Sequence, residues 1–262
     1  MLAPKQIAEK YVTVGTNKVN QPISKMAVLS LFAGFFIAIA GASATIASCM
    51  ADNPSISRLI NSLIFPAGLV MVVLAGSELF TGNCLILIPV LQKKVKFLSY
   101  LKCLAIVYIG NLIGSILVAA LFVYSHTPSL YDGKLAELLV NTASAKTSLS
   151  FSDAFLRAIL CNVLVCIAVW ITTGAENAVD KIAGLYPPIF VFVLAGYEHC
   201  VANMFYIPAG IFAASEYGIA AEGLNWGTFF INNLVPVTLG NIIGGAVLVG
   251  AGYWFALLHE KK

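Results

Sequence analysis

A motif that occurs twice inside apolar segments constrains the fold more than any other feature of this chain. Residues 75–83 are AGSELFTGN and residues 195–203 are AGYEHCVAN, so both copies follow the pattern A-G-x-E-x-x-x-x-N. A glutamate in the hydrocarbon core of a membrane is costly, and a break at a glycine exposes backbone groups that lipid cannot satisfy. Paired interruptions of this kind are typical of two halves that build one polar pathway near the middle of a bilayer.

The composition indicates an integral membrane protein. Of the 262 residues, 60% are hydrophobic and only 10% are charged, whereas soluble domains carry about 25% charged residues. The chain contains no Walker loop, dinucleotide-binding fingerprint or protease motif, and its cysteine spacings suggest neither a zinc site nor a disulfide framework. We therefore expect a protein that contacts the lipid bilayer, is not an enzyme, and binds no cofactor, metal or nucleic acid.

Six apolar segments predict an all-α membrane protein, since a bilayer core of about 30 Å needs roughly 20 helical residues. The second and fifth segments exceed one straight crossing, which leaves room for a break in each. Pro66 should bend the second, and Pro187 and Pro188 should start a helix in the fifth. The predicted spans are 26–50, 59–91 with a break near 76–83, 97–124, 154–173, 186–214 with a break near 196–203, and 229–258.

Three spans in each half predict a 3+3 inverted repeat, because an odd number of crossings makes the two halves enter the membrane from opposite sides. The third and sixth spans support the repeat, since GNLIG at 110–114 matches GNIIG at 240–244. Small residues spaced by four also let two helices approach closely. The expected domains are a cytoplasmic N-terminal amphipathic segment (1–25), a first three-helix repeat (26–125), an outer linker loop (126–152) and a second three-helix repeat (153–262).

The distribution of basic residues predicts the orientation. Six spans place both termini on one side, and most of the lysines fall on that side, so the positive-inside rule puts both termini in the cytoplasm. The expected cytoplasmic cations are Lys5, Lys10, Lys18, Lys25, Lys93, Lys94, Lys96, Lys102, Lys181, Lys261 and Lys262, and the expected outer ones are Arg58, Lys134, Lys146 and Arg157.

The N-terminal segment has a weakly apolar face. Ile7, Tyr11 and Val14 share one side of a helix over residues 4–18, and the charged residues lie elsewhere on it. Two interpretations stay open. The segment is either a helix lying on the membrane surface or a movable plug at the cytoplasmic mouth of a pore.

Glu78 and Glu198 occupy the same position in the two copies of the motif, as do Asn83 and Asn203. A symmetric pair suits a structural role at the helix breaks better than two separate pathway charges. We expect each carboxylate to accept hydrogen bonds from backbone N–H groups that the opposite break leaves free. A proton relay through the glutamates is the alternative.

Thr81 and His199 break the symmetry of the repeat. Val201 stands opposite Thr81, and Leu79 stands opposite His199. Because an unrepeated polar group in a repeated frame is a candidate for substrate contact, we expect both on the pathway. Histidine suits this task since its charge changes near neutral pH, and it can donate a hydrogen bond to an anion.

Two further polar residues have open interpretations. Asn162 lies in the apolar stretch CNVLVC of the fourth predicted span, where it makes helix–helix hydrogen bonds or lines the pathway. Lys146 lies between the two repeats. It is either an ordinary solvated lysine or a charge that attracts anions to the outer mouth.

Three segments resemble the hallmark sequences of the formate/nitrite transporter family: LFTGN at 79–83, CNVLVC at 161–166 and GYEHCVANM at 196–204. They occur in the family's order, and the resemblance covers nearly the whole chain. It implies an aquaporin-like protomer in a homopentamer with one pore per protomer. It also implies passage of small monovalent anions (formate, nitrite or hydrosulfide) across the bacterial inner membrane.

The resemblance also implies roles for individual residues. His199 would be the central histidine, Thr81 its partner, Asn162 the asparagine of the fourth span and Lys146 the vestibule lysine. Cys200 stands where serine is expected in formate and nitrite members, which favours the hydrosulfide branch. The apolar constrictions would involve Phe65, Leu69, Leu79, Phe80 and Phe192.

Apolar constrictions at Leu69 and Phe192 would exclude a bare ion through its desolvation cost. A weak-acid anion avoids that cost by taking up a proton near His199 and crossing as the neutral acid, which chloride cannot do. We therefore expect a channel for weak-acid anions, with proton-coupled symport of the same anions as the alternative. A neutral-solute channel is less favoured because paired Asn-Pro-Ala triplets are missing, and an enzyme using His199 and Cys200 is less favoured still.

Overall fold

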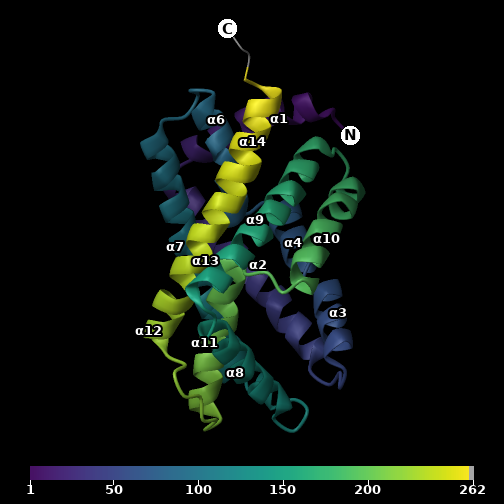
Figure 1. Cartoon of the computed structure of the whole chain (residues 1–262), viewed down its shortest axis with the longest axis vertical. Helices are drawn as coiled ribbons and strands as arrows, with labels where there is room; N and C mark the ends of the chain where they lie inside the picture. The colour runs from purple at the N-terminus through teal and green to yellow at the C-terminus, as the bar shows by residue number, and fades with distance from the viewer. Residues whose placement is uncertain (260–262) are drawn as a thin grey trace.

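The computed structural model describes residues 1–259; Lys261 and Lys262 of the orientation argument lie outside the described residues. Within residues 1–259 all regular secondary structure is helical, and α1 and α14 lie at one end of the molecule while α3, α8 and α12 reach the other (Figure 1). The α-helices are α1 Pro4–Asn20, α2 Ile23–Ser48, α3 Pro54–Ile64, α4 Ala67–Ala75, α5 Phe80–Asn83, α6 Leu87–Leu91, α7 Phe97–Tyr124, α8 Lys134–Thr147, α9 Phe151–Gly174, α10 Ala178–Leu194, α11 Cys200–Glu216, α12 Trp226–Thr228, α13 Val235–Ile242 and α14 Gly252–Leu257. Short 3₁₀ segments are η1 Cys84–Ile86 and η2 Thr127–Ser129, and π segments are η3 Phe229–Leu234 and η4 Ile243–Ala251.

Five helical stretches of the described chain are long and apolar enough to cross a membrane. They correspond to the first, second, third, fourth and sixth predicted spans. The predicted fifth span consists of α10 and α11, with 17 residues each. Neither is long enough to cross alone, because a crossing needs about 20 residues. The five stretches are Ile23–Ser48, Pro54–Ala75, Phe97–Tyr124, Phe151–Gly174 and Trp226–Leu257.

The prolines of the second and fifth spans act differently. Pro66 separates α3 from α4, as predicted for a residue without a backbone N–H. The predicted helix start at Pro187 and Pro188 is wrong, because α10 begins at Ala178 and contains both prolines. α10 packs against α9 and α3, and such neighbours make interior prolines tolerable in membrane helices.

Glycines bring pairs of long helices into close contact, as the small-residue pattern predicted. A β-carbon at Gly110 or Gly114 of α7 would overlap atoms of α2. A β-carbon at Gly240 or Gly244, in the last long helical stretch, would overlap the backbone of α9. The two glycine pairs therefore fix equivalent helix contacts, α7 on α2, and α13 with η4 on α9.

Residues 126–152 were expected to form an outer linker loop, and this is wrong for residues 134–147, which form α8. Leu135, Leu139 and Ala143 are buried along one face of this helix, which packs against α11. The helical spacing of these apolar residues determines the local structure, although glycine and proline precede it.

The N-terminal helix α1 lies against the other helices. Ile7 and Tyr11 are buried, the Tyr11 hydroxyl donates to the Gly82 carbonyl at 3.4 Å, and the backbone N–H of Leu2 donates to the carbonyl of Gly174 at 3.0 Å. In this structure α1 thus packs on the protein instead of lying apart from it on a membrane surface. Its role as a plug stays a prediction.

Candidate functional site

Both copies of the repeated motif interrupt the helical structure at a glycine with a left-handed backbone. Gly76 follows α4 with φ of +82°, and Gly196 follows α10 with φ of +68°, a conformation that glycine adopts without steric cost. The chain then runs extended to Phe80, where α5 begins, and to Cys200, where α11 begins. The first residues of the new helices have no helical partner for their N–H groups.

Two asparagines bind the backbone at these breaks. Asn111 of α7 accepts from the N–H of Phe80 at 2.9 Å and donates to the carbonyl of Glu78 at 2.9 Å. Asn241 of α13 accepts from the N–H of Cys200 at 2.9 Å and donates to the carbonyl two residues earlier at 3.0 Å. This role was not predicted from the sequence, although both asparagines hold the same place in the GNLIG and GNIIG segments.

The carboxylate of Glu78 is bound by side chains. Its oxygens accept from Lys18 of α1 at 2.7 Å and from Asn83 at 2.8 Å. Gln21 donates a third hydrogen bond at 3.1 Å. The N-terminal helix therefore supplies the positive charge that compensates a carboxylate buried at the first break.

The carboxylate of Glu198 has an equivalent environment. It accepts from Lys146 of α8 at 2.8 Å and from Asn203 at 2.6 Å, and Asn203 also donates to Asn233 at 2.8 Å. The expectation that the two glutamates accept from backbone N–H groups is therefore wrong. Lysine and asparagine side chains bind the carboxylates, whereas the asparagines of α7 and α13 bind the backbone N–H groups of Phe80 and Cys200.

The structure brings together His199 and Thr81, the two residues that break the repeat. The His199 Nε2 and Thr81 Oγ1 atoms lie 2.9 Å apart, and both residues are buried. Nδ1 of His199 accepts from the backbone N–H of Ala202 at 3.1 Å, at the N-terminus of α11. In the neutral ring the hydrogen is therefore on Nε2, and this N–H donates a hydrogen bond to Oγ1 of Thr81.

Asn162 makes helix–helix contacts. Its amide donates to the carbonyl of Thr81 at 3.3 Å and to the carbonyl of Asn241 at 2.7 Å, and the residue is fully buried. It lines neither of the two cavities described below. Of its two interpretations, the contacts favour the structural one, in which α9 ties α5 to α13.

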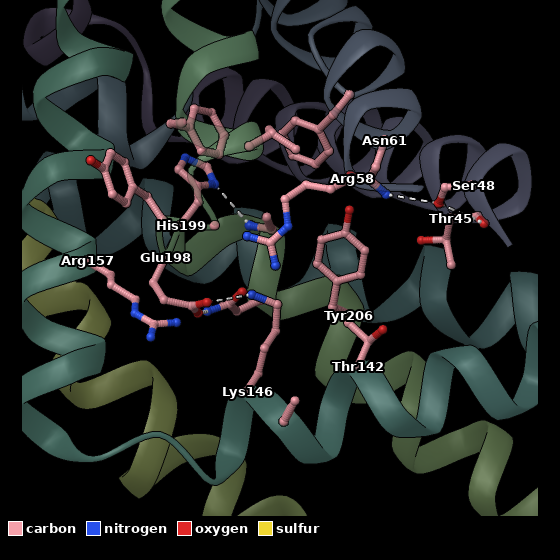
Figure 2. A pocket seen from close by; sticks show the side chains of 18 of the residues that line it. Thr45, Ser48, Arg58, Asn61, Thr142, Lys146, Arg157, Glu198, His199 and Tyr206 are labelled. Carbon is pink, nitrogen blue, oxygen red and sulfur yellow. Dashed lines mark hydrogen bonds and ion pairs between the residues drawn. The ribbon is translucent and has the colours of Figure 1, made fainter. Parts of the chain in front are cut away.

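A cavity of about 450 Å³ opens beside α8, and we call it the α8 cavity. Figure 2 shows the ring of His199, the Lys146–Glu198 ion pair and the guanidinium groups of Arg58 and Arg157 around it. Lys146 is therefore not an ordinary solvated lysine, since its charge is paired. The two arginines also line the cavity, although their sequence positions indicated only the orientation of the chain.

A second cavity of about 440 Å³ opens beside α1, and we call it the α1 cavity. Its charged lining residues include Lys10, Lys18 and Lys181, with Glu78 as their acidic neighbour. Leu69 and Leu79 also line it. Basic side chains thus outnumber acidic ones around both cavities, which favours anions over cations inside them.

The two cavities share no described lining residue, and the His199–Thr81 pair lies between them. His199 faces the α8 cavity, whereas Leu79 and Gly82, on either side of Thr81, face the α1 cavity. The hydrogen bond between His199 and Thr81 therefore joins the walls of the two cavities.

Aromatic rings flank this pair on the side of the α8 cavity. The centroid of Phe192 lies 5.8 Å from those of Phe65 and His199, and both phenylalanines line the α8 cavity. Phe80, expected at a constriction, packs edge-on against Tyr108 at 4.8 Å and lines neither cavity. We therefore leave Phe80 out of the proposed constriction.

The cysteines make no cross-link or metal site in the described part of the chain. All are free thiols, and all except Cys49 are buried, while residues 1–259 contain no group of side chains suited to hold a metal ion. Cys200 is fully buried and lines neither cavity. Its place in the structure therefore gives no support for hydrosulfide over the other anions.

An all-helical protein with two broken helices, and with cation-rich cavities on both sides of a buried polar pair, belongs to the class of membrane transport proteins. The family model described as "Formate/nitrite transporter" matches residues 5–255. This chain belongs to the formate/nitrite transporter family. Its relatives in this family are transporters and channels and not enzymes.

Individual relatives match along almost their full length. The chain is 37% identical to a "Probable formate transporter" of Methanothermobacter thermautotrophicus, covering 98% of both chains. It is 33% identical to "Formate channel FocA" of Escherichia coli strain K12, covering 100% of this chain and 96% of the relative.

The fold also matches solved structures. A "Pentameric formate channel with formate bound" has a TM-score of 0.80 at 33% identity, covering 90% of this chain and 98% of that one. An "FNT family ion channel" has a TM-score of 0.86 at 29% identity, covering 96% and 98%.

Proposed function

We propose that this protein is a channel for small monovalent weak-acid anions, with formate, nitrite and hydrosulfide as the candidate substrates. The observation that carries the proposal is the His199–Thr81 hydrogen bond, buried between two cavities with basic linings. The names of the relatives support formate in particular, since they include formate channels from several bacteria. Proton-coupled symport of the same anions is the alternative mechanism.

The architecture that we propose is a 3+3 inverted repeat with six crossings, assembled as a homopentamer. The matching asparagine contacts at the two breaks support the repeat, as do the matching lysine–glutamate pairs. The similar solved structure named as pentameric supports the oligomer. The excess of lysines at the α1 end supports cytoplasmic termini in a bacterial inner membrane, with the α8 cavity on the outer side.

In the proposed mechanism His199 acts as a neutral hydrogen-bond donor. Protonation of Nδ1 would break its bond with the N–H of Ala202 and place a cation at the positive end of the α11 dipole. The anion therefore takes up its proton near His199 from water and not from the ring itself. The resulting neutral acid passes Phe65, Phe192 and the leucines at 69 and 79, where a bare ion would lose its hydration without compensation.

A flux assay in liposomes tests the proposal. We expect protein-dependent uptake of formate, nitrite or hydrosulfide, and little uptake of chloride, which has no neutral acid at neutral pH. At a clamped membrane potential, uptake should follow the pH gradient if a proton crosses with the anion. Uptake that follows the potential alone would show passage of the bare anion, and chloride flux equal to formate flux would contradict the mechanism.

His199→Ala provides the matching variant. We expect it to lower weak-acid anion uptake about fivefold to 150-fold, because losing one buried hydrogen-bond donor is worth about 1–3 kcal/mol. The oligomer should remain assembled in detergent, since the asparagines that hold the second break are untouched. Wild-type uptake by a correctly assembled variant would remove His199 from the pathway.

A further inference from the structure

The α8 cavity contains two guanidinium groups that nothing else in the described chain neutralises. Arg58 of α3 and Arg157 of α9 both line this cavity and are both exposed. Neither makes an ion pair with a carboxylate of residues 1–259, because Glu198, the cavity's acidic residue, is paired with Lys146 at 2.8 Å. The net charge of the α8 cavity therefore comes from the two arginines.

The guanidinium group of Arg58 lies against the second break. A β-carbon at Gly196 would lie 2.6 Å from Nη1 of Arg58, so the guanidinium rests on the backbone of the second break. Figure 2 shows it between the ring of His199 and the Lys146–Glu198 pair, pointing into the cavity. A solute that reaches His199 from this side passes next to Arg58.

The part of the cavity wall beside Arg58 carries neutral polar groups. The side chains of Thr45, Ser48, Asn61 and Tyr206 line this part of the α8 cavity (Figure 2). Asn61 donates to the hydroxyl of Ser48 at 3.5 Å, and these hydroxyl and amide groups can solvate a polar solute without adding charge. The cavity thus combines two positive side chains with neutral polar groups, which can solvate an anion and carry no negative charge that would pair with the arginines.

We propose that Arg58 and Arg157 form an anion-capture site that prefers planar anions with two oxygen atoms. A guanidinium presents two parallel N–H donors whose spacing matches the two oxygen atoms of a carboxylate-like anion, one donor to each oxygen, whereas a spherical anion must accept both donors at a single centre, with a poorer angle for each. The site deepens the proposed function, on which it rests, because it selects formate and nitrite over chloride and hydrosulfide before the solute reaches His199. Lys146 is not part of it, since its charge compensates Glu198.

Arg58→Gln removes the charge of the side chain, whereas Arg58→Lys keeps the charge but removes the parallel N–H donors. Lys134→Gln is the control, because it removes an outer cation that lines neither cavity. We would measure the thermal dissociation of the purified oligomer in sodium formate and in sodium chloride. The wild type and Lys134→Gln should be stabilised more by formate than by chloride. Arg58→Gln should lose this difference, and Arg58→Lys should be stabilised equally by both salts. Arg157→Gln should reduce the difference.

Formate uptake into liposomes gives a second readout. At low ionic strength Arg58→Gln should raise the half-saturating formate concentration about threefold to tenfold, with an unchanged maximal rate, and high salt should abolish the change. The site would be overturned if formate does not stabilise the wild type more than chloride does. It would also be overturned if Arg58→Gln keeps that preference for formate. If Arg58→Lys keeps that preference, the geometric selection is wrong. Absence of anion uptake by the wild type, with formate stabilisation that depends on Arg58, would refute the proposed function and leave the site standing.

Discussion

At the scale of single residues, the contact between His199 and Thr81 depends on the threonine hydroxyl. His199 is fixed at the N-terminus of α11 by the N–H of Ala202, so its Nε2–H points to Oγ1 of Thr81 at 2.9 Å. Without that oxygen the imidazole N–H would be left in a buried place with no acceptor. The threonine methyl group, by contrast, makes no polar contact.

We therefore predict opposite results for two substitutions of similar size. Thr81→Val should reduce weak-acid anion uptake about fivefold to 150-fold, because an unsatisfied buried donor costs about 1–3 kcal/mol. Thr81→Ser should keep uptake within about threefold of the wild type, since it retains the hydroxyl. Initial uptake rates in liposomes check this, and equal rates for the two variants would show that the hydroxyl has no role.

The sequence predicted these residues better than it predicted their partners. His199 and Thr81 stood out because the repeat gives them no counterpart, and the structure places them in contact. The partners of the glutamates were predicted wrongly, because the side chains that hold the breaks come from α7 and α13. Asn111 and Asn241 lie about thirty and forty residues from the breaks they bind, and a single sequence does not show such long-range pairing.

At the scale of helices, α1 and α8 have the same function in the structure. Each delivers one lysine to a buried glutamate at a break, Lys18 to Glu78 and Lys146 to Glu198. The side chains of the glutamates are 6% and 5% exposed, and those of the lysines 24% and 18%. Removing one partner of such a pair leaves a charge that the protein does not compensate.

Lys18→Gln should thus lower the stability of the oligomer by about 1–3 kcal/mol, a range reduced for the partial exposure of the lysine. The double variant Lys18→Gln/Glu78→Gln should recover part of that loss, because no unpaired charge remains. Thermal dissociation of the purified oligomer measures both. Lys5→Gln, on the exposed side of α1, is the control and should change nothing. Strictly additive effects of the two substitutions would show that the pair is not coupled.

The helix α8 shows why element boundaries were harder to predict than the long spans. The segment around it contains several Ser and Thr residues, and Pro128 and Gly133 precede the helix, so the composition indicated a loop. The apolar residues Leu135, Leu139 and Ala143 nevertheless recur at helical spacing and are buried. A stronger weight on periodicity than on composition would have predicted this helix.

At the scale of the whole molecule, the apolar spans and the two breaks followed from the sequence because membrane helices need about 20 apolar residues. The cavities did not, since each is formed by side chains from several helices that are distant in sequence. Arg58 illustrates this, because only the structure shows it lying over Gly196. The predicted constriction residues, including Leu69 and Phe192, also come from different helices. Their position on the pathway stays a prediction.

That prediction concerns the barrier to strong-acid anions. If Leu69 and Phe192 form the constriction, their apolar side chains offer no polar group to replace the water that an ion loses on entry. Leu69→Ser or Phe192→Ser would place a hydroxyl there and allow water to remain. We expect chloride uptake to rise relative to formate uptake in both variants, measured as a flux ratio in liposomes at one fixed pH. In the proposed mechanism formate crosses this barrier as formic acid, so only chloride uptake should rise.

Neighbouring exposed residues on the same helices provide the controls. Leu74 of α4 and Val191 of α10 are 42% and 45% exposed and line neither cavity, so Leu74→Ser and Val191→Ser should leave the flux ratio unchanged. A rise in chloride uptake in these controls would indicate a general leak of the protein. A wild-type ratio in both constriction variants would place the barrier elsewhere, and it would remove the physical reason for the anion to cross as a neutral acid.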